Sequence, residues 1–446
     1  MQKWRKSLRT VGTQSTTTNG HAVTALPATP TSLRIAIVGM GGVTATFRNW
    51  PERVIGRALV QRGHRVVNIG YHQPNQEALR ERATVVDGIT VRRVPVRHWP
   101  NHAVYHALDE LGPFDVIHLF HPRNVLAYGT TRWAERHHVP TVYTWLGPFH
   151  DRYLIDDRER PYEEQPRYDR LLWSFAEALH WTLRDGHLRD HLRNYALHYP
   201  LRMAKALLPC SEHEANVMRS MGLEQTSTVV PLWIDVAHVS AMPARVSPGP
   251  HPTILFIGQL TPRKGYDLLV RALPEVLKYH PKTTVQVVAG LNEADRLVME
   301  ALAAEMGVRD QIIFRGRVDD AELVNLLRAA DVYVTPTRYE GFGLTLLEAM
   351  AAPCPIVASA IPVVNEIVEH GVSGWLVAPN DVAALAEGIV RVLGDAGLRA
   401  RLCQGGRAAL SSQFDEQALI CEIERVYRRV SARPRRYTAK IYDLPG

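Results

Sequence analysis

The sequence predicts an α/β protein built from two doubly wound parallel-sheet lobes in tandem. Three observations lead to this fold class. The chain of 446 residues exceeds what one ordinary core organises. Short apolar runs alternate with helical patterns along most of its length, which is typical of strands buried in a parallel sheet. The alternation stops in the Pro- and Gly-rich segment 240–252 and then restarts, so we expect a linker there.

The first 32 residues are rich in Thr, Ser, Ala and Pro and show no apolar period, so we expect a disordered tail. No apolar h-region follows the basic residues of this segment, which argues against a cleaved signal peptide. No apolar run is long enough to span a bilayer, and the four cysteines form no CxxC pair. We therefore expect a cytoplasmic protein without disulfides.

Residues 33–239 are expected to form the first lobe, on the acceptor side. Its predicted strands are "LRIAIVGM", "HRVVNIG" and the segments 115–119, 141–144 and 206–209. The stretch 151–205 is long for one connection and rich in aromatic residues. We expect one or two helices there, carrying acceptor specificity.

Residues 253–412 are expected to form the second lobe. Its predicted strands are "TILFIG", "TVQVVAG", "QIIF", "DVYVT" and "PIVAS". Helices are expected near 266–279, 293–306 and 319–329, from about 344, and at 381–393. Residues 413–446 should supply a C-terminal helix, at 415–430, and a basic tail. Two such lobes leave a cleft between the carboxyl ends of their sheets, where ligands usually bind.

The net charge of +7 gathers at the two ends of the chain. Such clusters are most often solvated tails, and we expect no nucleic-acid partner. Peripheral contact with anionic lipid on the inner membrane face is the alternative that the charges leave open.

A phosphate site is predicted in the second lobe. Arg263 and Lys264 follow the strand "TILFIG", and two adjacent cations at a strand's carboxyl end suit a diphosphate. In "RYEGFGLTLLEAM", Gly341 and Gly343 allow close backbone approach, and a helix starts near Leu344. Its N-terminal N–H groups and dipole would then face the same ligand.

Two glutamates, Glu340 and Glu348, flank these glycines. Glu348 sits one turn into the helix, where the dipole alone favours an acid, or where it could accept hydrogen bonds from ribose hydroxyls. Glu340 is placed to reach a sugar. Because both lie on one loop–helix element, they do not suit a glycosidase, whose carboxylates flank the sugar bond from opposite walls.

The string "EGFGLTLLEAM" resembles the E-x7-E signature of retaining glycosyltransferases of family 4, which have the GT-B fold. "GQLTPRKG", "FRGRV" and "EIVEHGVSGWLVAPND" are similar to further segments of that family. In the first lobe, "GG" at 41–42, "RGHRV", "DVIHLFHP" and "LPCSEHEANVMRSMG" have looser counterparts. The resemblance runs over roughly residues 33 to 425.

This resemblance implies a retaining hexosyltransferase that uses a UDP- or GDP-sugar and requires no metal or other cofactor. It implies catalytic roles for Arg263, Lys264, Glu340 and His121. The implied donor-binding residues are Gly42, Gly258, Val318, Gly341, Phe342, Gly343, Leu344, Thr345 and Glu348. The acceptor stays open. Two departures from the family pattern are "PLWID" (231–235), with Leu232 and Trp233, and "TWLGPFHDRY" (144–153), which leaves the role of His150 open.

Other readings are weaker. A nicotinamide-dependent oxidoreductase fits Gly39 and Gly41, but Thr44 replaces the third glycine and no acid follows "HRVVNIG". A nucleotide-sugar epimerase can share the fold but would lack the two-glutamate string. A zinc site at His187 and His191 is disfavoured, because no Glu lies between the two histidines and no third ligand is evident. Side chains along a strand point alternately to its two faces, so His118 points to the face opposite to that of His121. This favours a structural role for His118.

Overall fold

The computed structural model describes residues 32–39, 42–74, 76–95, 103–121, 125–145, 174–186, 188–223, 225–242, 251–290 and 293–432. The described residues after Ser32 belong to one compact unit that begins at Leu33. Several sequence-based predictions lie outside this range: nearly all of the N-terminal tail, most of the linker, the basic C-terminal tail, and the histidines at 150 and 187.

The first lobe is organised by an eight-stranded sheet in the order β3-β4-β2-β1-β5-β6-β7-β8. Its strands are β1 (Arg34–Val38), β2 (Arg65–His72), β3 (Ala83–Val86), β4 (Ile89–Pro95), β5 (Val116–Phe120), β6 (Thr141–Thr144), β7 (Ala206–Leu207) and β8 (Thr226–Ser227). All neighbours pair in parallel except β3 and β4, which form an antiparallel edge. The predicted parallel sheet is confirmed, and the antiparallel edge strand is an addition that the sequence analysis missed.

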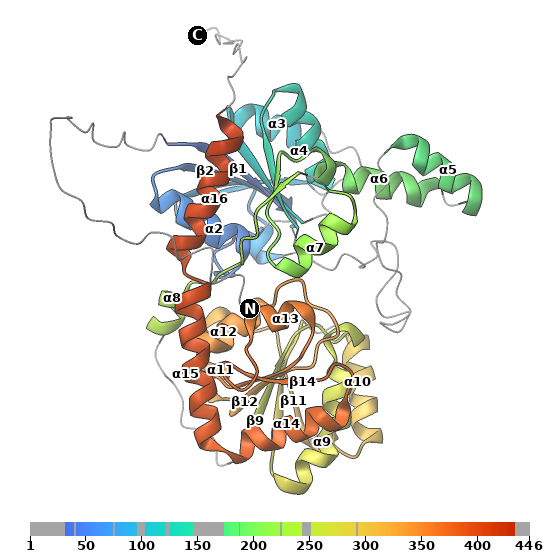
Figure 1. Cartoon of the computed structure of the whole chain (residues 1–446), viewed down its shortest axis with the longest axis vertical. Helices are drawn as coiled ribbons and strands as arrows, with labels where there is room; N and C mark the ends of the chain where they lie inside the picture. Colours follow the sequence, from blue (N-terminus) through green and yellow to red (C-terminus); the bar gives the residue numbers. More distant parts are fainter. Residues whose placement is uncertain are drawn as a thin grey trace, which may run out of the picture. The chain divides into compact units, whose positions relative to one another are not determined.

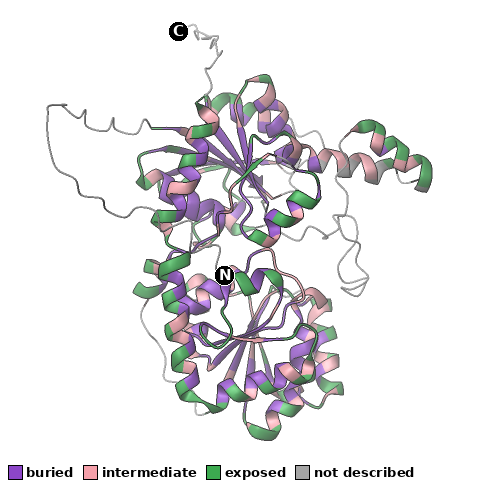
Figure 2. Cartoon of the chain, viewed as in Figure 1, coloured by how far each residue is buried: buried purple, intermediate pink, exposed green. Residues whose placement is uncertain are grey.

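The second lobe holds a six-stranded parallel sheet in the order β11-β10-β9-β12-β13-β14. Its strands are β9 (Thr253–Ile257), β10 (Thr284–Val288), β11 (Ile312–Gly316), β12 (Val332–Thr335), β13 (Ile356–Ser359) and β14 (Trp375–Val377). The central strands are almost fully buried, as Figure 2 shows in purple. Burial on both faces explains why these segments read as unbroken apolar runs.

Helices flank both sheets (Figure 1). The first lobe carries α2 (Pro51–Gln61), α3 (Ala103–Leu111), α4 (Val125–Arg136), α5 (Phe175–Asp185), α6 (Leu188–Met203), α7 (Glu212–Ser220) and α8 (Val236–Ala241). The second carries α9 (Tyr266–Tyr279), α10 (Glu293–Glu305), α11 (Asp320–Ala329), α12 (Leu344–Ala351), α13 (Pro362–Ile367), α14 (Val382–Gly394) and α15 (Ala396–Gln413). Two helices, α5 and α6, lie in the stretch 151–205, as expected. Among the described residues, no helix combines the length and apolar character needed to cross a membrane.

The last helix, α16 (Glu416–Ser431), returns to the first lobe and contacts α2 and β5 (Figure 1). Tyr427 on this helix is fully buried and its hydroxyl lies 2.6 Å from Nδ1 of His118 on β5. Glu424 pairs with Arg62 at 2.7 Å. The helix was predicted at the correct place in the sequence, but its packing partner was not.

In both sheets the strand order reverses beside the first strand of the lobe, between β1 and β5 and between β9 and β12. Ligands of doubly wound proteins bind at the carboxyl ends of strands at such switch points. The predicted site residues follow these four strands: Gly42 follows β1, His121 follows β5, Arg263 and Lys264 follow β9, and Glu340 follows β12. The fold therefore gathers them at the switch points.

Candidate functional site

The cationic turn after β9 is built around Gly265. Arg263 and Lys264 belong to a short 3-10 helix (Pro262–Lys264) that ends at Gly265, which has a φ of +71°. A Cβ at Gly265 would lie 1.9 Å from the carbonyl oxygen of Pro336, so only glycine lets the turn approach the loop after β12 this closely. The backbone N–H of Arg338 donates to the Arg263 carbonyl at 2.8 Å and joins the two loops.

Lys264 and Glu340 form an ion pair across these two loops. The Nζ of Lys264 lies 2.5 Å from Oε2 of Glu340, and the side chains are 18% and 17% exposed. Burial raises the pKa of Glu340, but the nearby cations Lys264 and Arg263 outweigh it and hold this pKa below its usual value. Glu340 is therefore ionised at neutral pH and can accept hydrogen bonds from hydroxyl groups.

The helix α12 begins as predicted, with Gly343 as its N-cap at a φ of +99°. Thr345, in its first turn, accepts a hydrogen bond from the Tyr333 hydroxyl at 2.9 Å. The ring of Phe342 is buried and packs edge-on against Phe414, with ring centroids 6.2 Å apart, so this side chain belongs to the core. Any donor contact of Phe342 would have to come from its backbone.

Glu348 lies one turn further along α12 and contacts the first lobe. Its Oε1 accepts a hydrogen bond from Nδ2 of Asn49 at 2.9 Å. Burial raises the pKa of Glu348 to about 7; the Asn49 hydrogen bond opposes this rise and the charge of Asp320 adds to it. The carboxyl group therefore titrates near neutral pH.

Two further donor-site candidates follow strands of the second sheet, β9 and β11. Gly258, directly after β9, has a φ of +155°, and a Cβ there would lie 3.5 Å from the side chain of Lys264. Val318 follows β11 and is half-buried against the hydrophobic core. Leu344, at the first position of α12, packs against the same core.

The first-lobe residues Gly42 and His121 converge on Trp50 and Glu52. A Cβ at Gly42 would lie 1.7 Å from Cδ1 of Trp50, and the Gly42 N–H donates to Oε2 of Glu52 at 3.2 Å. The rings of Trp50 and His121 lie 5.8 Å apart, and Nε2 of His121 lies 3.7 Å from Oε1 of Glu52. Gly42 thus faces protein groups in this structure, and its contact with a donor stays a prediction.

His118 has a structural role, as expected. It is fully buried, with Nδ1 beside the Tyr427 hydroxyl and Nε2 2.8 Å from the Thr144 hydroxyl. Burial lowers its pKa to about 3, so the ring is neutral.

The altered "PLWID" segment also has a structural explanation. Leu232 and Trp233 are buried, and the Trp233 indole N–H donates to Glu416 of α16 at 3.0 Å. Asp235 caps α8 through the N–H of His238 and pairs with Arg48 at 3.0 Å.

The turn between β1 and α2, which supplies Arg48, Asn49 and Trp50, was not predicted from the sequence, and neither was Glu52 in the first turn of α2. The signal was present: polar and aromatic residues fill the loop that follows the first strand, at a switch point of the sheet. The glycines at the start of this loop were considered in the sequence, but the residues after them carry no motif of their own and were overlooked.

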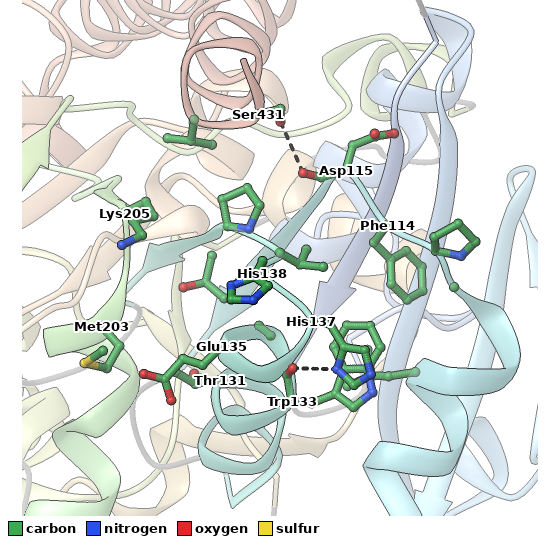
Figure 3. A pocket seen from close by; sticks show the side chains of 18 of the residues that line it. Phe114, Asp115, Thr131, Trp133, Glu135, His137, His138, Met203, Lys205 and Ser431 are labelled. Carbon is green, nitrogen blue, oxygen red and sulfur yellow. Dashed lines mark hydrogen bonds between the residues drawn. The ribbon is translucent and has the colours of Figure 1, made fainter. Parts of the chain in front are cut away.

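A large hollow of about 1090 Å³ lies elsewhere, where β5 and β6 begin and α3 and α4 end (Figure 3). Trp133, His137, His138 and Lys205 are among its lining residues. Basic side chains are favoured beside helix C-termini, which carry a partial negative charge. This hollow lies at the amino ends of the strands, whereas the predicted site residues follow their carboxyl ends. We therefore assign it no part in donor binding.

Among the residues that the structure describes, no group of three or more His, Cys, Asp or Glu side chains is arranged to hold a metal ion. The basic segments at the two ends of the chain lie outside the described residues, so membrane contact stays a prediction.

Two family models match the two lobes. Residues 53–233 match the glycosyl transferase 4-like domain, and residues 241–409 match the glycosyl transferases group 1. The two matched ranges include β9, β12 and α12 with the candidate donor site, as well as the first-lobe segment that carries His121.

Curated relatives agree with these families. A glycogen synthase of Mycobacterium tuberculosis is 34% identical over 230 residues, which cover 51% of this chain and 55% of that protein. A D-inositol 3-phosphate glycosyltransferase of Acidothermus cellulolyticus is 38% identical over 189 residues, covering 41% and 42% of the two chains. The chain spans about half the length of the curated relatives it matches.

Solved structures show the fold. A sucrose-phosphate synthase from Thermosynechococcus elongatus has a TM-score of 0.68 at 21% identity, covering 90% of this chain and 100% of that one. HepE from Anabaena, solved with UDP-glucose, has a TM-score of 0.67 at 18% identity, covering 89% and 100%. The predicted GT-B fold is confirmed.

Proposed function

We propose that this chain, which belongs to the GT-B glycosyltransferases of group 1 and the 4-like family, transfers a hexose from a nucleoside-diphosphate sugar to an acceptor hydroxyl with retention of configuration. One observation carries the proposal. The cationic turn with Lys264, the carboxylate of Glu340 and the N-terminus of α12 converge at the carboxyl ends of β9 and β12. Together they suit a diphosphate with a sugar attached.

Lys264 and Glu340 can serve the donor while they stay paired. An ammonium group has three donors, so the bond to Glu340 leaves two for the diphosphate oxygens. Glu340, ionised in the same pair, can accept from hydroxyls of the transferred sugar. The pairing holds both groups in place before the donor arrives, which favours electrostatic stabilisation of the transition state.

The reaction breaks the bond between C1 of the sugar and the β-phosphate oxygen, and its electron pair passes to the phosphate. Arg263, Lys264 and the N-terminal N–H groups of α12 would stabilise this developing charge. The acceptor oxygen bonds to C1 on the same face, and the acceptor proton passes to the leaving phosphate. In this proposal no enzymic base and no metal ion is required.

The uridine donors are the first to test, because HepE from Anabaena was solved with UDP and with UDP-glucose. A panel of UDP- and GDP-sugars should be screened for thermal stabilisation, since ligands that bind the folded state raise its apparent stability. The absence of stabilisation by every member of the panel would contradict the proposal.

Transfer or donor hydrolysis should then be measured with Lys264→Ala and Glu348→Ala. We expect losses of about 100-fold or more for Lys264→Ala, as for other groups that stabilise transition-state charge. Lys278→Ala is the matched control, because Lys278 is an exposed lysine paired with Glu275 on α9. Wild-type rates in both site variants would show that the site is misassigned. Conversion of one nucleotide sugar into another without an acceptor would instead indicate an epimerase.

A further inference from the structure

The turn between β1 and α2 places one amide side chain between the two lobes. Nδ2 of Asn49 donates to Oε1 of Glu348 at 2.9 Å, and Oδ1 of Asn49 accepts from the backbone N–H of Asp235 at 3.0 Å. Because one end must donate and the other must accept, these two partners fix the orientation of the amide.

The preceding residue holds the same turn in place. The backbone N–H of Arg48 donates to Oδ2 of Asp320 at 2.9 Å, and its guanidinium pairs with Asp235 at 3.0 Å. Two acids of the second lobe, Asp320 and Glu348, therefore accept hydrogen bonds from this first-lobe turn. The position of Asn49 is set by its neighbours as well as by its own contacts.

We propose that Asn49 is a positioning residue that completes the nucleoside end of the donor site from the other lobe. It holds the Glu348 carboxylate by Oε1 and leaves Oε2 for the ribose hydroxyls of a nucleoside diphosphate. A carboxylate has about four acceptor positions, so one protein donor leaves room for the ligand. The inference rests on the proposed function, because it assumes that Glu348 binds ribose.

The ionisation of Glu348 makes this role measurable. A carboxylate can accept from both ribose hydroxyls, whereas the protonated acid has lost part of that capacity. The groups that act on Glu348 are Asn49 from the turn, Asp320 from α11 and Tyr333 from β12. Since Asn49 opposes the effect of burial on the pKa of Glu348, removing its donor should raise that pKa further.

The test is a calorimetric titration with UDP, and in parallel with GDP, between pH 6.5 and 8.5. Asn49→Asp is the sharpest variant, because it keeps the acceptor for the Asp235 N–H and replaces only the donor that faces Glu348. We expect it to weaken nucleotide binding about 10- to 100-fold at pH 7. Asn49→Ala should move the pH midpoint of binding upward relative to the wild type. Glu348→Gln cannot ionise at this position, so the pH dependence of its binding gives the contribution of the nucleotide itself, which serves as the reference.

Two results of this titration with the wild type and the single variants would overturn the inference, and they differ in meaning. If the wild type binds neither nucleotide, the proposed function fails and the inference fails with it. If the wild type binds but both Asn49 variants keep its affinity and pH midpoint, the inference alone fails.

A double variant guards against poor folding of the single ones. Asn49→Asp combined with Glu348→Gln can form the same hydrogen bond with donor and acceptor exchanged. We expect this protein to regain the thermal stability of the wild type and to bind the nucleotide as weakly as Glu348→Gln. Wild-type affinity in the double variant would show that no carboxylate at 348 is needed, and would overturn the inference.

Discussion

Nζ of Lys264 lies 2.5 Å from Oε2 of Glu340, although the two residues are 76 positions apart in the chain. The pair joins the loops that follow β9 and β12, the two strands at which the order of the second sheet reverses. The pair therefore links the candidate phosphate-binding residue, Lys264, to the candidate sugar-binding residue, Glu340. Loss of this ion pair should affect the stability of the protein as well as donor binding.

Replacing both partners of this pair should destabilise the protein by less than the sum of the two single replacements. Lys264→Met leaves the half-buried carboxylate of Glu340 without its main counter-charge. Glu340→Gln leaves the ammonium group of Lys264 without its carboxylate partner. We expect each single variant to lower the free energy of unfolding by roughly 1–3 kcal/mol, and the double variant by less than their sum. Urea unfolding of all four proteins measures the coupling. Additive losses would mean that the pair contributes no interaction of its own.

Gly265 should tolerate alanine less well than another left-handed glycine of the same lobe. Gly265 and Gly307 have nearly equal φ angles, +71° and +69°, but a Cβ meets the Pro336 oxygen at 1.9 Å in the first case and nothing within 4 Å in the second. Gly307→Ala should cost about 1 kcal/mol from backbone strain alone. Gly265→Ala should cost about 1–3 kcal/mol more from the clash. Equal losses in urea unfolding would refute the steric explanation.

Gly42 should be replaceable only if Trp50 is removed as well. A Cβ at Gly42 would lie 1.7 Å from the Trp50 ring, so Gly42→Ala must displace this indole. The same indole is the ring neighbour of His121, so the surroundings of His121 change as well. We expect Gly42→Ala to reduce sugar transfer at least about tenfold, because misplacement of groups near the reacting atoms is costly. The double variant Gly42→Ala with Trp50→Ala restores the space. If Gly42→Ala alone transfers at the wild-type rate, the loop is more adaptable than the structure indicates.

The sequence was informative where a short motif carries its own geometry. Gly343 precedes a helix at the carboxyl end of a strand, and this local pattern predicted both the start of α12 and the place of Glu348 one turn into it. The pairing of Lys264 with Glu340 was not predicted, because it depends on which loops the strand order brings together. Sequence pattern alone does not encode that order.

The interlobe contacts were the least predictable part. Asn49 has no neighbour in the sequence that marks it, and its contact with Glu348 spans 299 positions. Phe342 shows the converse case. It lies within the string "EGFGLTLLEAM", but its ring packs in the core against Phe414. Membership in a motif indicates where the backbone runs and does not settle where each side chain points.

Glu214 should make the protein less stable as the pH rises from about 5 to 8. It is buried on α7, and burial raises its pKa to about 8 although the Cys210 N–H, at 2.6 Å, opposes the shift. Because this pKa lies above its value in the unfolded chain, the folded state binds the proton more tightly. Ionisation through this range therefore favours unfolding.

Glu214→Gln removes this titration and keeps an acceptor for the Cys210 N–H. The difference in unfolding free energy between variant and wild type should move in favour of the variant by about 1.4 kcal/mol per pH unit between the two pKa values. Urea unfolding at pH 5, 6.5 and 8 measures the trend. A difference that does not change with pH would show that Glu214 ionises normally in the folded protein.

Tyr427 should stabilise the first lobe without affecting nucleotide binding in the second. Its hydroxyl lies 2.6 Å from Nδ1 of the buried, neutral His118, whose other nitrogen lies beside Thr144. Tyr427→Phe leaves a buried ring nitrogen without its partner and should lower the free energy of unfolding by about 1–3 kcal/mol. Tyr279→Phe is the control, because Tyr279 is 65% exposed and its hydroxyl can bond to water.

Nucleotide binding should not depend on Tyr427, because this residue lies on α16, whereas the candidate donor site is built from α12 and the turn after β9. The dissociation constant of a nucleotide that the wild type binds should therefore stay unchanged in Tyr427→Phe. A loss of stability no larger than that of the control would show that α16 is held on the first lobe by its apolar side chains alone.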